Sequence, residues 1–154
     1  MEKLTARVHL EIGSRLENVE LVEIAVEAAL NQLQVDEDAC HWFGIAVREA
    51  VANAIQHGNS LDPDKLVEID LSVEDGEIVV RVRDEGSGFD PDKVPNPLNV
   101  ENLLRPDGRG LLLMQQFMDS MDYSFDPNRG TALTMRKRIE VPQLASERQE
   151  EEEK

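Results

Sequence analysis

Three polar residues follow one another at four-residue intervals between Asp36 and Gly58: Glu49, Asn53 and His57. In an α-helix this spacing places side chains on one stripe, and here the stripe flanks the apolar positions instead of lying among them. A carboxylate and an amide one turn apart at the edge of a core can line a pocket and contact a metal ion or water. The alternative is a solvated helix face, with His57 near the helix end stabilised by the helix dipole.

A second cluster is the segment Asp84-Glu-Gly86-Ser-Gly88-Phe89, which directly follows an alternating apolar run. Its two glycines allow a sharp turn and bring a ligand close to the backbone. The Asp84 carboxylate accepts hydrogen bonds, which suits an exocyclic amine such as that of adenine. The alternative is a glycine-rich turn with an acidic cap. A dinucleotide-binding fingerprint is a poor match, because no long helix follows at once.

A third cluster, Gly108-Arg109-Gly110-Leu111, precedes a candidate helix. Free backbone amides at a helix start, with the dipole behind them, form an anion site. Arg109, together with Arg105, adds positive charge. An ordinary loop-to-helix junction has the same composition. A fourth pair, Gly130 and Thr131, opens the last apolar run, where small residues allow close approach to a ring.

The elements that must position these clusters follow from hydrophobic periodicity. Alternation predicts strands over 4–12, 67–73, 78–82, 121–125 and 131–139, and helical spacing predicts helices over 14–33, 36–58 and 111–118. Ser14 and Glu17 match a capping box, and Asp75-Gly76 indicates a two-residue hairpin turn. Early helices and mostly late strands predict an α+β fold. We expect a two-layer α/β sandwich, with helices on one face of a mixed, mostly antiparallel sheet.

The chain's charge restricts its partners. The 154 residues, enough for one domain, carry 32 acidic against 16 basic side chains, a formal net charge of −16. Such a surface repels nucleic acid and anionic lipid, so neither is an expected partner, and a phosphate ligand needs local amides, arginines or a metal ion. The acidic segment 141–154 has no apolar period, and we expect it to be disordered. A lone Cys40 and the lack of a long apolar run predict a cytoplasmic protein.

Taken together, the four clusters resemble the Bergerat-fold ATPase family and, within it, the anti-sigma-factor serine/threonine kinases. Segment 49–59 resembles the N box, 84–89 the first glycine box, 108–119 the second and 130–131 the third. The His-Gly after the N box and the Phe-Met-Asp after the second glycine box favour this branch over histidine kinases. The resemblance implies a histidine-kinase-like ATPase domain over 1–140.

The resemblance also implies a role for each matched residue. ATP with Mg²⁺ would be the cofactor, Asn53 would coordinate the metal, and Glu49 would be the general base toward a partner's serine or threonine hydroxyl. Asp84 would accept the adenine amine. The remaining matched residues would surround the nucleotide: Gly86, Gly88 and Thr131 near the base, and Gly108, Arg109, Gly110 and Leu111 at the phosphates, with Arg105 in a lid over about 91–107.

The resulting hypothesis is a protein kinase that phosphorylates a partner of the anti-sigma-factor-antagonist type. A sigma factor is a second candidate partner, and the family implies a homodimer. Two other hypotheses stay open: a nucleotide-gated module that sequesters a sigma factor or another regulator without phosphorylating it, and a stand-alone piece of a histidine-kinase-like ATPase. Glu49 favours catalysis, since a mere binding module needs no base at that position.

Overall fold

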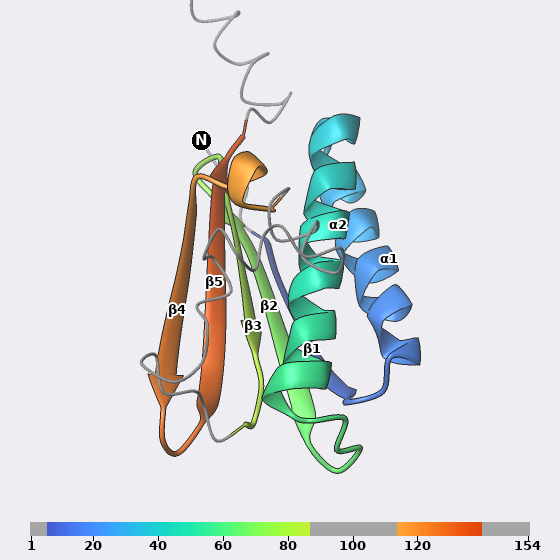
Figure 1. The fold of residues 1–154 in the computed structure, drawn as a ribbon. Coiled ribbons are helices and arrows are strands. Elements are labelled where there is room, and N and C mark those ends of the chain that lie inside the picture. Colours follow the sequence, from blue (N-terminus) through green and yellow to red (C-terminus); the bar gives the residue numbers. More distant parts are fainter. Residues whose placement is uncertain (1–5, 87–113, 140–154) are drawn as a thin grey trace, which may run out of the picture.

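The computed structural model describes residues 6–86 and 114–139 (Figure 1). Two α-helices, a π-helical turn and a five-stranded sheet make up most of this part of the chain. In chain order the elements are β1 (Ala6–Gly13), α1 (Glu17–Gln32), α2 (Glu37–Asn53), the π-helical turn η1 (Ala54–Gly58), β2 (Leu66–Glu74), β3 (Glu77–Arg83), β4 (Ser120–Asp126) and β5 (Gly130–Arg138). A further helical turn covers 114–117, inside the helix expected over 111–118.

The sheet has the strand order β1-β2-β3-β5-β4. Each of the four pairings between these described strands is antiparallel. Figure 1 shows α1 and α2 side by side on one face of this sheet, so the expected two-layer α+β sandwich is confirmed. The β2–β3 hairpin also turns where predicted, because Asp75 and Gly76 both have positive φ, 54° and 77°.

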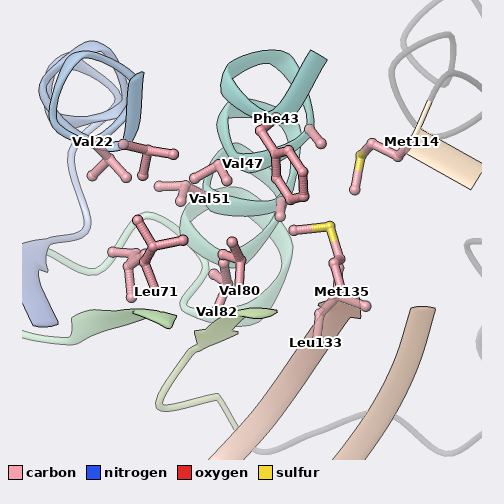
Figure 2. Close-up of a cluster of buried hydrophobic side chains, with 14 of the residues drawn as sticks. Val22, Phe43, Val47, Val51, Leu71, Val80, Val82, Met114, Leu133 and Met135 are labelled. Atoms are coloured by element: carbon pink, nitrogen blue, oxygen red, sulfur yellow. The ribbon is translucent and has the colours of Figure 1, made fainter. Parts of the chain in front are cut away.

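The core fills the space between the helices and the sheet. Along β3, Ile78, Val80 and Val82 alternate with partly exposed residues and are buried, as a strand with one covered face requires. Figure 2 shows side chains of α2 meeting those of β2, β3 and β5, with Met114 joining from the segment before β4. Each such side chain contributes about 1.5–3 kcal/mol when fully buried. This packing fixes α2 against β3, the two elements that carry the first two clusters.

The start of α1 differs from the prediction. Leu16 occupies the cap position without any side-chain hydrogen bond to the helix. Ser14 is buried instead, and its hydroxyl donates to the backbone oxygen of Lys65 over 2.7 Å. The predicted capping box is therefore wrong, because Ser14 bonds to the distant β2 entry. At α2 the cap is Asp36, whose carboxylate accepts from the Ala39 amide at 3.3 Å.

The end of α2 also differs from a simple helix. The predicted helix over 36–58 is α-helical only to Asn53 and then widens into η1. The backbone amide of Asn59 donates to the backbone oxygen of Ala54, five residues back, over 2.8 Å. Such π-turns are rare and are frequently found at functional sites. Here the wide turn delivers Gly58 and Asn59 to the end of β3.

In the ranges 6–86 and 114–139, no helix is both long and apolar enough to cross a membrane. The expected tail over 141–154 and the expected lid over about 91–107 lie outside the described residues.

Candidate functional site

The best-defined part of the site is the carboxylate that ends β3. Asp84 is buried, and its amide donates to the Thr131 oxygen at 2.9 Å. One carboxylate oxygen, Oδ1, accepts from the amides of Gly86 at 2.9 Å and Thr131 at 3.2 Å. No described residue donates a hydrogen bond to the other oxygen, Oδ2. Asp84 is thus fixed through one oxygen and keeps the other for a donor.

The pKa of Asp84 reflects two opposing effects. Burial raises the pKa of this carboxyl above its ordinary value, while the Gly86 and Thr131 amides and the more distant Lys65 pull it down. A donor from a ligand to Oδ2 would act in the same direction as the two amides. Binding such a donor therefore favours the ionised form of Asp84.

Three glycines lie close to Asp84. A Cβ on Gly58 would overlap the Asp84 carboxylate, and one on Gly130, which has a φ of +93°, would overlap the Asp84 backbone oxygen. A Cβ on Gly86 would overlap the Gly58 oxygen. Backbone from η1, from the loop after β3 and from the start of β5 therefore converges at one point. The structure brings together Asp84, Gly86 and Thr131 from the predicted set.

The helix stripe lies on the element that leads into this point. Glu49 and Asn53 are half-buried one turn apart on α2, whereas His57 is exposed on η1. Neither Glu49 nor Asn53 has a side-chain hydrogen bond to a described residue. Burial raises the pKa of the Glu49 carboxyl, and the positive charge of the neighbouring Arg48 opposes the shift. A carboxyl with a raised pKa and no fixed partner is suited to accept a proton.

The oxygen donors on α2 fit a particular kind of metal site. No cluster of three or more His, Cys, Asp or Glu side chains that could hold a metal occurs in the two described ranges. Mg²⁺ commonly uses one or two protein oxygens and completes its shell with water and substrate phosphates. The amide oxygen of Asn53, which has no hydrogen bond to a described residue, matches this second pattern with Glu49 one turn away. A Mg²⁺ ion would be held jointly by the protein and a phosphate ligand.

The predicted phosphate-binding residues Gly108, Arg109, Gly110 and Leu111, together with Gly88 and Arg105, lie outside the described residues and stay predictions. The helical turn that follows them is packed against α2. Phe117 stacks on Trp42 with ring centroids 6.3 Å apart and meets Phe43 edge-on at 5.3 Å.

One residue close to Asp84 was not found from the sequence. Asn59 is fully buried, and its side chain bonds to the β1–α1 junction, to the start of β2 and to the loop after β3. An asparagine after a helix-ending glycine is typical of an exposed loop, and no spacing signal distinguishes a buried one. The π-turn that carries it inward has no sequence signature either.

Comparisons with known sequences agree with the motif analysis. The family described as "Histidine kinase-like ATPase domain" matches residues 12–137. The chain is 35% identical over 134 residues to an anti-sigma F factor of Geobacillus kaustophilus, covering 86% of this chain and 92% of that protein. It is 32% identical over 140 residues to an anti-sigma F factor of Clostridium botulinum, covering 88% and 96%.

Comparisons with solved structures agree on the fold. A crystal structure of the RsbU and RsbW domains of Rv1364c from Mycobacterium tuberculosis superposes with a TM-score of 0.64 at 17% identity, covering 87% of this chain. A blue-light activated histidine kinase of Erythrobacter litoralis superposes with a TM-score of 0.55 at 20% identity, covering 85%. This chain spans 32% and 46% of those two structures.

Proposed function

The chain belongs to the histidine-kinase-like ATPase family, and on that premise we propose that it is an ATP-dependent serine/threonine-protein kinase that regulates a protein partner. A domain of this family binds ATP. The observation that carries the proposal is the Asp84 carboxylate, which is held through Oδ1 by two backbone amides while Oδ2 is free of described donors. Such an oxygen accepts the exocyclic amine of adenine and repels the carbonyl oxygen that guanine has at the same ring position.

In the proposed reaction, the partner's hydroxyl oxygen forms a bond to the γ-phosphorus as the bond from that phosphorus to the β–γ bridging oxygen breaks. The hydroxyl proton passes to Glu49, whose raised pKa makes it a stronger base than an exposed glutamate. Asn53 would hold Mg²⁺, which would supply charge neutralisation at the phosphates. Such catalysis relies on positioning and charge stabilisation. In this proposal Asp84 is the base-binding carboxylate, Asn53 the metal-binding amide and Glu49 the proton acceptor.

The remaining site residues complete the proposal. Gly86, Gly88 and Thr131 would lie beside the base. Gly108, Arg109, Gly110 and Leu111 would bind the phosphates, with Arg105 adding positive charge from the lid. We place the ATPase domain at 1–140 and an acidic tail at 141–154.

The proposed phosphoacceptor is a protein of the anti-sigma-factor-antagonist type, with a sigma factor as a second ligand. The support is that several relatives, from 31% to 35% identical, are anti-sigma F factors. If phosphorylation made the antagonist dissociate from the kinase, it would switch the kinase from one partner to the other. We further propose that the protein acts as a homodimer in the cytoplasm.

The test is incubation of the protein with γ-labelled ATP and a purified antagonist-type partner, followed by phosphoamino-acid analysis. The proposal expects label on serine or threonine, and loss of that label when the acceptor residue is replaced by alanine. Normal ATP binding without any phosphoserine or phosphothreonine would contradict the kinase assignment and favour the nucleotide-gated regulator-binding module. Failure to bind ATP would contradict the nucleotide site itself.

A further inference from the structure

The loop that carries Asp84 is held by three successive backbone amides. The Asp84 amide donates to the Thr131 oxygen at 2.9 Å, and the Gly86 amide to Asp84 Oδ1 at 2.9 Å. Between them, the Glu85 amide donates to the side-chain oxygen of Asn59 at 2.7 Å. The first bond is made within the backbone and the third uses the ligand-binding carboxylate itself. Among the described residues, Asn59 is therefore the separate side chain that accepts one of these three amides.

The hydrogen bonds of the Asn59 side-chain amide fix its orientation. Its Nδ2 donates to the Leu66 backbone oxygen at 3.0 Å, which is purely an acceptor, and its Oδ1 receives the Glu85 amide, which is purely a donor. The second Nδ2 proton goes to Ser14 Oγ at 2.8 Å. That hydroxyl uses its own proton on the Lys65 oxygen, so its lone pair is available to Asn59. Rotation of the side-chain amide by half a turn would place its oxygen against the Leu66 oxygen and its nitrogen against the Glu85 amide. Two acceptors would then face each other, and so would two donors.

A second connection fixes the same loop. The Leu66 amide donates to the Glu85 carboxylate at 2.6 Å, so Glu85 is held at its backbone by Asn59 and at its side chain by Leu66. Asn59 itself is fully buried, and an unmade hydrogen bond in such a place is costly. The network ties the loop after β3 to the entry of β2 and to the β1–α1 junction.

From these contacts we propose that Asn59 is a positioning residue for base recognition: it orients the Asp84–Gly86 loop so that Asp84 Oδ2 meets the exocyclic amine of adenine. This inference rests on the proposed nucleotide site and adds to it a residue that does not touch the ligand. Asn59 acts on Asp84 through the Glu85 peptide. Its replacement is expected to weaken nucleotide binding and base discrimination more than it affects the chemistry of transfer.

The test uses the full chain with Asn59→Ala, Asn59→Asp and the control Ser14→Ala. Asn59→Ala removes the acceptor for the Glu85 amide, whereas Asn59→Asp keeps an acceptor but places a carboxylate against the Leu66 oxygen. Ser14→Ala removes a neighbouring buried bond and leaves the Glu85 contact in place. Binding of ATP and GTP is measured by titration calorimetry, stability by urea denaturation, and protection of the Glu85 amide by hydrogen exchange.

We expect Asn59→Ala to weaken ATP binding about tenfold, to reduce the preference for ATP over GTP and to lose protection at Glu85. In transfer assays, KM for ATP should rise while kcat is kept. Asn59→Asp should be the least stable variant and yet bind ATP more tightly than Asn59→Ala. Ser14→Ala should lose stability and keep its affinity. If Asn59→Ala does not fold, Asn59→Ser, whose hydroxyl is too short to reach Glu85, takes its place.

Affinity that simply follows stability across the variants would overturn the proposal, as would wild-type ATP affinity in folded Asn59→Ala. Failure of the wild-type chain to bind ATP would instead overturn the proposed function. In that event, protection at Glu85 that is lost in Asn59→Ala and kept in Ser14→Ala would still support the positioning contact.

Discussion

The two carboxylates of the proposed site are held in opposite ways. Asp84, at the end of β3, is fixed by two backbone amides and surrounded by three glycines, so its direction is set before any ligand arrives. Glu49, on α2, is half-buried and has no hydrogen bond to a described residue. The difference matches two tasks. Recognition of a base needs a fixed acceptor, whereas a general base must be free to take a proton and release it.

The largest effect expected from separating these tasks is at Glu49. Glu49→Gln keeps the size and polarity of the side chain but cannot accept the proton, so phosphoryl transfer should fall about 1,000-fold while ATP affinity stays near wild type. Single-turnover transfer and calorimetric binding measure the two quantities separately. Glu20→Gln, at an exposed position of α1, is the control for loss of a helix glutamate and should retain both. Equal losses of binding and transfer in Glu49→Gln would remove the distinction between the two carboxylates.

The next largest effect is at Asp84. In Asp84→Asn the side-chain oxygen still accepts from Gly86 and Thr131, which turns the amide nitrogen toward the ligand in place of Oδ2. The new side-chain nitrogen and the exocyclic amine of adenine are then two donors that face each other, and ATP affinity should fall about 100-fold. Asp126→Asn, an exposed carboxylate at the end of β4, makes the same charge change and should bind ATP normally. Tight ATP binding by Asp84→Asn would show that the base is recognised elsewhere.

The rigidity around Asp84 is tested by adding one methyl group. The new Cβ in Gly58→Ala would overlap the Asp84 carboxylate, so we expect a loss of about 2 kcal/mol in the free energy of unfolding. In Gly13→Ala the nearest atoms, the Pro63 oxygen and Asn18 Nδ2, lie 3.7 and 3.8 Å away, which is ordinary contact. Urea denaturation should show little change for this control. Similar stability for both variants would mean that the loop around Asp84 can adjust.

The smallest effect is a displacement of the pH profile. Burial raises the pKa of Glu49, and the base must be deprotonated to act, so transfer should decline with falling pH at a higher pH than for an exposed glutamate. Stability has the opposite trend. The contribution of a carboxyl with a raised pKa is present at low pH and is lost as the pH rises through the folded pKa, so Glu49→Gln should be more stable than wild type at neutral pH. Rate profiles and urea midpoints between pH 4 and 8 would show both. A midpoint at neutral pH that is lowered by Glu49→Gln would contradict the burial effect.

Much of the fold could be predicted, because the main signals are local. Alternating valines and isoleucines fix the β2–β3 hairpin, and the required positive φ at Asp75 and Gly76 fixes its turn. Glycine spacing identified the segment after β3 as a place of close approach. The family resemblance, drawn from four motifs in order, is confirmed by the match over residues 12–137.

What could not be predicted depends on contacts between distant segments. Ser14 stands in a sequence that is typical of a helix cap, but its hydrogen-bond partners are Lys65 and Asn59, 51 and 45 residues away. The strand order that places β5 between β3 and β4 also leaves no local trace, although it brings the Thr131 amide to Asp84. A pattern read along the chain identifies residue types suited to a site, and tertiary packing decides which of them meet.

The π-turn at the end of α2 makes the number of residues between Ala54 and Gly58 important for the site. The turn between Ala54 and Gly58 already holds one residue more than an ordinary α-helical turn, so a further inserted residue there would rotate all that follows by about 100° around the helix axis. Gly58 would turn away from Asp84, and Asn59 would move away from Ser14 and Glu85 together. The loop beyond, from Ser60 to Lys65, has no such phase to preserve. Insertions among relatives should therefore gather after Asn59 and spare the five residues before it.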